Sequence, residues 1–126
     1  MGLHLDLVLC SSSRRTTETL ERIRPALGGT RIETESGLYG AGALELLVRL
    51  RRIADDVNSV MLIGHNPGVA DLTHALVGDD EAVEDDPRFE KFPTAATAAL
   101  SFTGHWHALE SSIACLDSFW TPGPPS

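Results

Sequence analysis

Two short segments of the sequence carry side chains suited to binding an anion. Arg14 and Arg15 follow a run of three serines, and His65 lies in the turn Gly64-His65-Asn66-Pro67. In both places an apolar run typical of a strand passes into a stretch with helical periodicity, and the first N–H groups of a helix favour an anion. An Arg can hold two phosphate oxygens at once, and a His can donate a further hydrogen bond. These features predict a phosphate pocket, although an exposed first helical turn stays open as the plainer interpretation of the two arginines.

The rest of the chain alternates between predicted strands and helices. This alternation predicts an α/β fold, a three-layer α/β/α sandwich with a mainly parallel central sheet and its site at the carboxyl ends of the strands. The expected strands are 5–10, 31–34 and 59–64, the expected helices are 14–27, 42–55 and 66–77, and two further strands, 95–102 and 111–119, are joined by a hairpin connection at 103–107.

Local signals place the ends of these elements. Ser12 or Ser13 can cap the first helix, and Asn66 is expected to cap the third, with Pro67 in its first turn. The run 59–64 is apolar throughout, as a parallel strand covered on both faces would be.

Composition limits the class of protein. The 126 residues are 42% hydrophobic and 22% charged, which is the mix of one globular domain; we expect it to span 1–120, with 121–126 as a disordered tail. The net charge of −8 argues against nucleic-acid or anionic-membrane partners. No apolar run approaches the roughly 20 residues of a membrane span, and the first residues lack the pattern of a signal peptide, so we expect a cytoplasmic location.

Other chemistries fit the sequence less well. Four residues separate Cys10 from Arg15, whereas a cysteine-based phosphatase loop needs five, so Cys10 is expected to be a core residue. His105 and His107 alternate onto one face but have no third ligand nearby, so no metal and no cofactor are expected. The acidic run 79–86 lacks the glycine and terminal Glu of a calcium loop and is expected to be a solvated loop.

Four segments carry a resemblance to a known family. Residues 7–20, a strand followed by Ser, three residues, Arg and a helix with Glu-Thr, resemble the second signature of the histidine phosphatase superfamily. Residues 60–68 are similar to its later signature, in which a second catalytic His follows a strand. Residues 38–41 and 91–96 resemble segments of the small bacterial phosphohistidine phosphatases, and the matches are collinear from about 5 to 120.

The resemblance implies a phosphohydrolase that transfers a phosphoryl group to a histidine nucleophile and then hydrolyses the phosphohistidine. By the Ser-x-x-x-Arg spacing, Arg15 takes the role of the second Arg, and His65 takes the role of the second His. The Asn66 backbone N–H would help to bind the phosphate. The implied substrate is a phosphorylated protein, carrying phosphohistidine, or a small phosphate ester.

One part of the family pattern has no match. The family's first strand ends in Arg-His-Gly or Arg-His-Ala and supplies the nucleophile, but this sequence contains no Arg-His pair. The corresponding strand and helix would precede Met1, so we expect these 126 residues to be inactive as written; the alternative is a non-catalytic phosphate-binding or interaction module. We also expect strands 5–10 and 60–64 to face each other across a gap or to leave unpaired edges that favour self-association.

Overall fold

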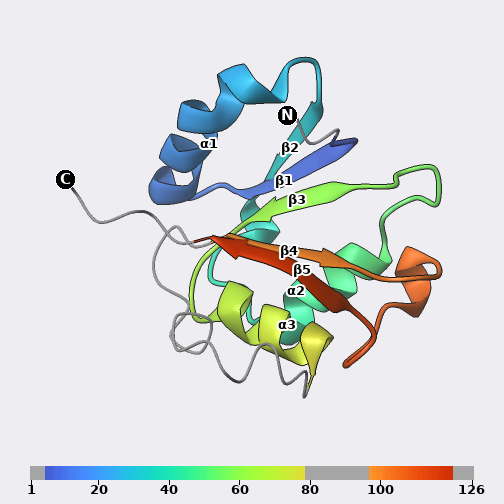
Figure 1. Ribbon diagram of the computed structural model, residues 1–126. Helices are drawn as coiled ribbons and strands as arrows, with labels where there is room; N and C mark the ends of the chain where they lie inside the picture. Colours follow the sequence, from blue (N-terminus) through green and yellow to red (C-terminus); the bar gives the residue numbers. More distant parts are fainter. Residues whose placement is uncertain (1–4, 79–96, 121–126) are drawn as a thin grey trace.

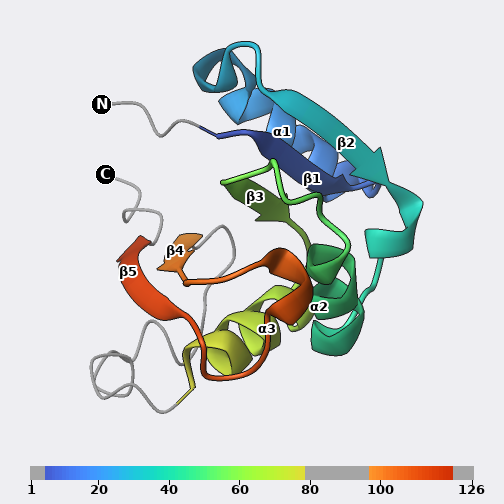
Figure 2. The ribbon, with the colours of Figure 1, turned by 90° about the vertical axis from the view of Figure 1, so that its right-hand side faces the viewer.

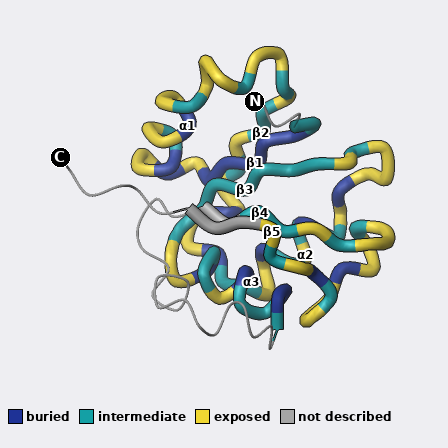
Figure 3. Tube along the Cα trace, viewed as in Figure 1, coloured by how far each residue is buried: buried dark blue, intermediate teal, exposed yellow. Residues whose placement is uncertain are grey.

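The central element of the fold is a short, fully buried strand. In the computed structural model, which describes residues 5–78 and 97–120, β1 (Leu7–Ser11) lies between β2 (Arg31–Glu35) and β3 (Val60–Ile63), and both neighbours run parallel to it (Figure 1). All five residues of β1 are buried, as the dark segment in the middle of Figure 3 shows. The expected α/β fold with a mainly parallel sheet is confirmed.

Helices cover both faces of this sheet. On one face, α1 (Arg14–Leu27) packs through Leu20 against Val8 and Cys10. On the other face, α2 (Ala43–Arg51) and α3 (Gly68–Val77) pack against the alternate β1 residues, Leu7 and Leu9. Figure 2 shows α1 on one side of the strands and α2 with α3 on the other. The side-chain alternation of a strand therefore divides the core into two halves, which gives three layers.

The β3 strand behaves as its apolar sequence predicts. Met61 and Ile63 contact the core half under α1, and Val60 and Leu62 contact the other half, so both faces are covered. Its four residues are nevertheless only half-buried. Among the described residues β3 pairs only with β1, so one edge of the strand stays open.

The α1 helix has the bounds that the sequence predicts. Ser13 is the capping residue, since its hydroxyl accepts a hydrogen bond from the Thr16 N–H at 3.2 Å. The helix ends at Gly28, whose φ of +60° is costly for residues with a side chain.

The two later strands form a sheet of their own. The antiparallel strands β4 (Thr97–Ser101) and β5 (Cys115–Trp120) pair with each other, and Figure 1 shows them below β3. The expectation that the second strand begins at 111 is wrong by four residues. The connection is longer than a hairpin turn because it contains a 3-10 helix, η2 (Trp106–Ala108), whose Trp106 Nε1–H donates to the Val57 carbonyl at 2.7 Å.

Three other expectations need correction. The second helix ends at Arg51 rather than near 55, since Arg52 adopts turn angles of φ −91° and ψ 0°. The third begins at Gly68; its N-cap position is Pro67, in the αR region, so Asn66 does not cap it. The Asn66–Pro67 peptide bond is cis.

The expected gap between strands 5–10 and 60–64 does not exist. Their residues are hydrogen-bonded neighbours, from Leu7 beside Val60 to Cys10 beside Ile63. Among the described residues, the edge strands are β2 and β3 in the larger sheet and β4 and β5 in the smaller one. The acidic run 79–86, the segment 91–96 and the tail 121–126 lie outside the described residues.

Candidate functional site

The turns after β1 and β3 meet at one edge of the sheet. Because the strands are parallel and Cys10 lies beside Ile63, Ser11 and the residues after Ile63 leave the sheet together. The Ser11 hydroxyl lies 3.1 Å from Nε2 of His65, which is within hydrogen-bond distance. The two segments that the sequence analysis selected are therefore in direct contact.

A network of hydroxyl groups fixes the first of these turns. The Thr16 hydroxyl donates to the Ser11 carbonyl at 2.7 Å, and the Ser13 N–H donates to the Ser11 hydroxyl at 3.4 Å. Toward the end of β2, the Ser12 N–H donates a hydrogen bond to the Glu35 carbonyl at 3.3 Å. Ser11, Ser13 and Thr16 are buried, so the start of α1 is held in one position relative to His65.

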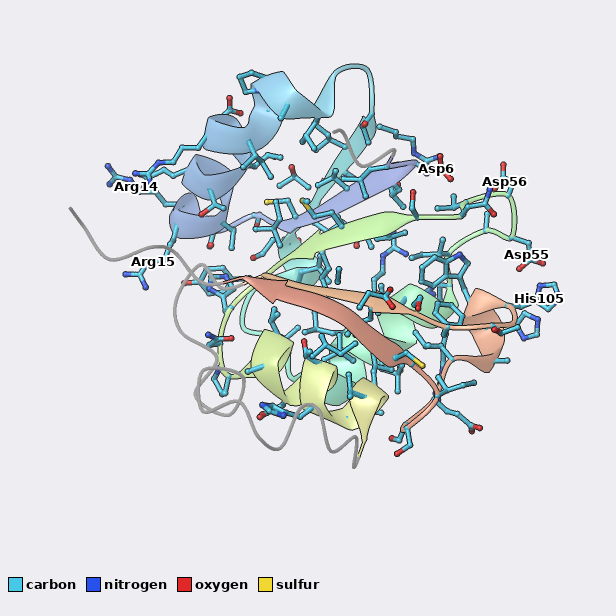
Figure 4. All side chains as sticks on the ribbon, viewed as in Figure 1. Asp6, Arg14, Arg15, Asp55, Asp56 and His105 are labelled. Carbon is cyan, nitrogen blue, oxygen red and sulfur yellow. The ribbon has the colours of Figure 1, made fainter. Side chains whose placement is uncertain are left out.

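Arg14 and Arg15 leave this turn with different partners. The Arg14 side chain forms an ion pair with Glu18 at 3.1 Å along the helix, and both side chains are exposed. Arg15 forms no ion pair within residues 5–78 and 97–120, so its guanidinium is available to a ligand. In Figure 4, Arg14 extends away from the body of the protein, and Arg15 lies below it, on the side of α1 where β4 begins and β5 ends.

His65 has a second neighbour that the sequence analysis missed. The Tyr39 ring lies edge-on to the imidazole, with centroids 5.5 Å apart and planes at 64°. Tyr39 follows the 3-10 helix η1 (Ser36–Leu38) and is 67% exposed. The only sequence signal for it was the resemblance of residues 38–41 to a family segment.

Close packing holds the start of α3 beside this turn. A Cβ atom on Gly68 would collide with the Ala41 carbonyl oxygen, so only glycine lets the helix approach the chain this closely. The Val69 N–H donates to the His65 carbonyl at 2.9 Å. The site residue Asn66 lies in the exposed turn between His65 and the helix.

Cys10 is a core residue, as expected. It is fully buried, and its thiol donates to the carbonyls of Ser11 at 3.3 Å and Thr16 at 3.5 Å. Burial raises the pKa of the Cys10 thiol, although the Thr16 hydrogen bond opposes this. A protonated, enclosed thiol is a poor nucleophile.

An ion pair between α2 and the end of β2 stabilises the edge of the sheet where the site lies. The Arg49 guanidinium donates two hydrogen bonds to the Glu35 carboxylate, at 2.8 and 2.7 Å. This hydrogen bonding from Arg49 lowers the pKa of Glu35, and burial opposes the shift. Since Glu35 lies beside Ser11 in the sheet register, the pair fastens α2 to the edge where the site lies.

Comparisons with known proteins identify relatives that match nearly the whole chain. No protein-family model matches the chain. An uncharacterized protein of Mycobacterium tuberculosis is 34% identical over 124 residues, which cover 94% of this chain and 74% of that protein. An uncharacterized protein of Mycobacterium leprae is 30% identical over 119 residues, covering 94% of this chain and 72% of that protein.

Solved structures give the family its identity. A protein assigned as the phosphohistidine phosphatase SixA of Nakamurella multipartitia superposes with a TM-score of 0.79 and 28% identity, covering 95% of this chain and 72% of that one. The corresponding Agrobacterium tumefaciens protein gives 0.73 and 27%, covering 94% and 68%. A tungstate complex of the protein histidine phosphatase SixA shares the fold, with a TM-score of 0.69 and 21% identity.

The chain thus has the α/β fold of these solved phosphohistidine phosphatases. This chain belongs to the histidine phosphatase superfamily.

Within the described part of the chain, no helix is long and apolar enough to span a membrane.

Proposed function

We propose that this chain is a phosphohistidine phosphatase-type domain that binds a phosphoryl group between Arg15 and His65. The observation that carries the proposal is the 3.1 Å contact between Ser11 and His65, which joins the two anion-favouring turns. The proposed partner is a phosphorylated protein, or a small phosphorylated molecule, which the similarity to the SixA structures also supports.

The proposed roles follow from the chemistry of the side chains. Arg15 would supply a permanent cation whose fork can hold two phosphoryl oxygens. His65, oriented by Ser11, would donate a hydrogen bond to a third oxygen, and the backbone N–H groups at the start of α1 and of Asn66 would add to the field. In phosphoryl transfer such groups act mainly by stabilising charge on the transferring group.

We further propose that these 126 residues bind phosphate without turning over a substrate. The sequence contains no Arg-His pair, and His65 is already engaged by Ser11. Of the other described histidines, His74 lies within α3, and His105, with its neighbour His107, lies at the opposite end of the sheet from Arg15 (Figure 4). This placement favours the alternative of a non-catalytic phosphate-binding module for the chain tested by itself.

We also propose a cellular location and an oligomeric state for the chain. Cys10 and Cys115 are both free thiols, which supports a reducing, cytoplasmic location. The open edges of β3 and β4 among the described residues support self-association.

The test is a titration with phosphate, and then with vanadate, followed by NMR. Amide signals of residues 11–16 and 64–68 should shift, and the shifts should disappear in Arg15→Ala but persist in Arg14→Ala, whose guanidinium is engaged by Glu18. Amide signals that stay unchanged at millimolar ligand would contradict the proposed pocket. Ligand-induced shifts that disappear equally in Arg15→Ala and Arg14→Ala would contradict it too. Hydrolysis of a phosphohistidine peptide that is lost in His65→Ala would support the catalytic form and refute the non-catalytic one.

A further inference from the structure

A second cluster of side chains with metal-ligating groups lies at the far end of the sheet. Asp55, in the turn before β3, lies beside His105 and His107, and Figure 4 shows Asp55 and His105 at the opposite end of the molecule from Arg15. One ligand atom from each of the three residues lies within 4.8 Å of the other two. All three residues are exposed, so an ion could reach them from solvent.

The separation of the donor atoms suits a small divalent ion. Nδ1 of His105 and Oδ1 of Asp55 are 3.4 Å apart. Zinc–nitrogen and zinc–oxygen bonds of about 2.0–2.1 Å at a tetrahedral angle separate two ligand atoms by about 3.3 Å. These two donors therefore already have the spacing that a shared zinc ion requires.

The His107 imidazole lies beside that of His105 in the connection between β4 and β5. The His105 and His107 rings are stacked, with centroids 5.3 Å apart and planes within 7° of parallel. His107 must therefore turn by a side-chain rotation to bring a nitrogen onto the shared ion. Both residues are exposed, so this rotation disturbs no core packing.

Trp106 joins the two segments that carry these ligands, the turn of Asp55 and the connection between β4 and β5. Its Nε1–H donates to the Val57 carbonyl at 2.7 Å, and its ring packs edge-on against Phe102 at 5.1 Å. The Val57 N–H in turn donates to the Ala54 carbonyl at 3.1 Å, closing the turn that holds Asp55. The Asp55 turn and the two histidines are thus fixed to each other through the residue between the histidines, which reduces the entropy cost of binding an ion.

We propose that Asp55, His105 and His107 form a surface site for a divalent transition metal of the zinc type, with water completing the coordination. Two imidazoles and one carboxylate suit zinc and its neighbours, whereas magnesium and calcium prefer oxygen ligands alone. From the sequence alone no metal was expected, because the histidine pair had no third ligand nearby. The fold supplies one from a residue fifty positions earlier in the chain.

The experiment is a zinc titration followed by calorimetry and by NMR of the histidine side chains. Zinc should shift the imidazole signals of His105 and His107 and leave those of His65 and His74 unchanged, and magnesium should shift none of them. Asp55→Asn, His105→Ala and His107→Ala should each weaken zinc binding by about 10- to 100-fold or more, since loss of even an outer partner of a ligand has that effect.

The matched control is Asp56→Asn, which removes the same charge from the neighbouring exposed residue. It should change zinc affinity by about 2-fold at most, because an exposed charge outside the ligand set acts only through a screened field. Equal losses in Asp55→Asn and Asp56→Asn, or zinc-induced shifts centred on His65 or His74, would overturn the proposal. All four substitutions are at exposed positions, and unchanged thermal unfolding without zinc would confirm that any loss of binding is local.

Discussion

The Ser11 hydroxyl and the His65 imidazole are 3.1 Å apart although 54 positions separate them in the chain. The sheet register creates this contact, because β1 and β3 run in parallel and end side by side. Ser11 is fully buried, whereas His65 is half-buried. The serine therefore belongs to the rigid core and holds a more accessible imidazole in place.

Replacement of Ser11 by Ala should weaken phosphate binding by roughly 2- to 10-fold, since a single hydrogen bond contributes about 0.5–1.5 kcal/mol. The His65 ring would lose its partner and sample other rotamers. The affinity can be measured from the same NMR titration. Ser12→Ala is the matched control, because the Ser12 side chain is exposed and its backbone N–H contact to Glu35 is retained. A phosphate affinity in Ser11→Ala equal to that of the wild type would refute the positioning role.

Replacement of Gly68 by Ala should destabilise the protein by about 1–3 kcal/mol, the usual cost of overpacking. The added methyl group would collide with the Ala41 carbonyl and push the start of α3 away from the chain near Tyr39. Urea unfolding measures the loss of stability. Gly37→Ala is the control, because a Cβ atom there meets nothing within 4 Å. If both variants unfold at the same urea concentration as the wild type, the close approach at Gly68 is unimportant for stability.

The Glu35–Arg49 pair should make stability depend on acid pH. Because the folded protein lowers the pKa of Glu35 below its ordinary value of 4.5, the carboxylate stabilises the fold fully above that pH. This contribution is lost as the pH falls through the lowered pKa. Glu35→Gln should therefore cost about 1 kcal/mol at neutral pH and much less near pH of about 3, as measured by urea unfolding at the two pH values.

The control for this prediction is the Glu33–Arg31 pair. Its side chains are 36% and 67% exposed, against 27% and 22% for Glu35 and Arg49. Solvent screens the more exposed pair, so Glu33→Gln should have little effect at either pH. A cost for Glu35→Gln that is the same at both pH values would show that the lost interaction is not ionic.

Local sequence signals were sufficient for some parts of the fold. The apolar run of β1, the serine cap and the glycines after residue 27 predicted β1 and α1 with nearly the observed bounds. The parallel strands also predicted that the two anion-favouring turns would lie at one edge. The strand and the helix cap depend on residues that are close together in the chain, whereas the shared edge follows from the parallel direction expected for the strands.

Features that depend on distant contacts were not predictable in this way. The late start of β5 and the η2 helix accompany the hydrogen bond from Trp106 to Val57, which joins segments 49 positions apart. The contact of Tyr39 with His65 and the approach of Asp55 to His105 likewise require the assembled fold. The direct pairing of β1 with β3 corrects an expectation that came from the family pattern and not from the residues of the two strands.

The open strand edges should make the isolated chain self-associate. Among the described residues, β3 pairs only with β1, and β4 pairs only with β5, so each strand has one edge without a ladder partner. Unpaired backbone groups on such an edge form a template for a strand of another copy. Sedimentation should therefore show a mass that rises with protein concentration.

A charge placed on the β4 edge tests whether that edge forms the contact. Ser101 is exposed at the end of β4, where its hydroxyl donates to the Asp117 carboxylate at 3.0 Å, and Ser101→Lys would place on this edge strand a charge of the kind that opposes edge-to-edge pairing. If a charge on the paired edge costs about 0.2–1 kcal/mol, as an unfavourable cross-strand pair does, association should weaken by up to roughly 5-fold. Ser36→Lys, at an exposed residue in η1, makes the same change in net charge, which by itself would favour association of this acidic chain. A monomer at every concentration would disprove self-association, and equal effects of the two lysines would exclude β4 as the contacting edge.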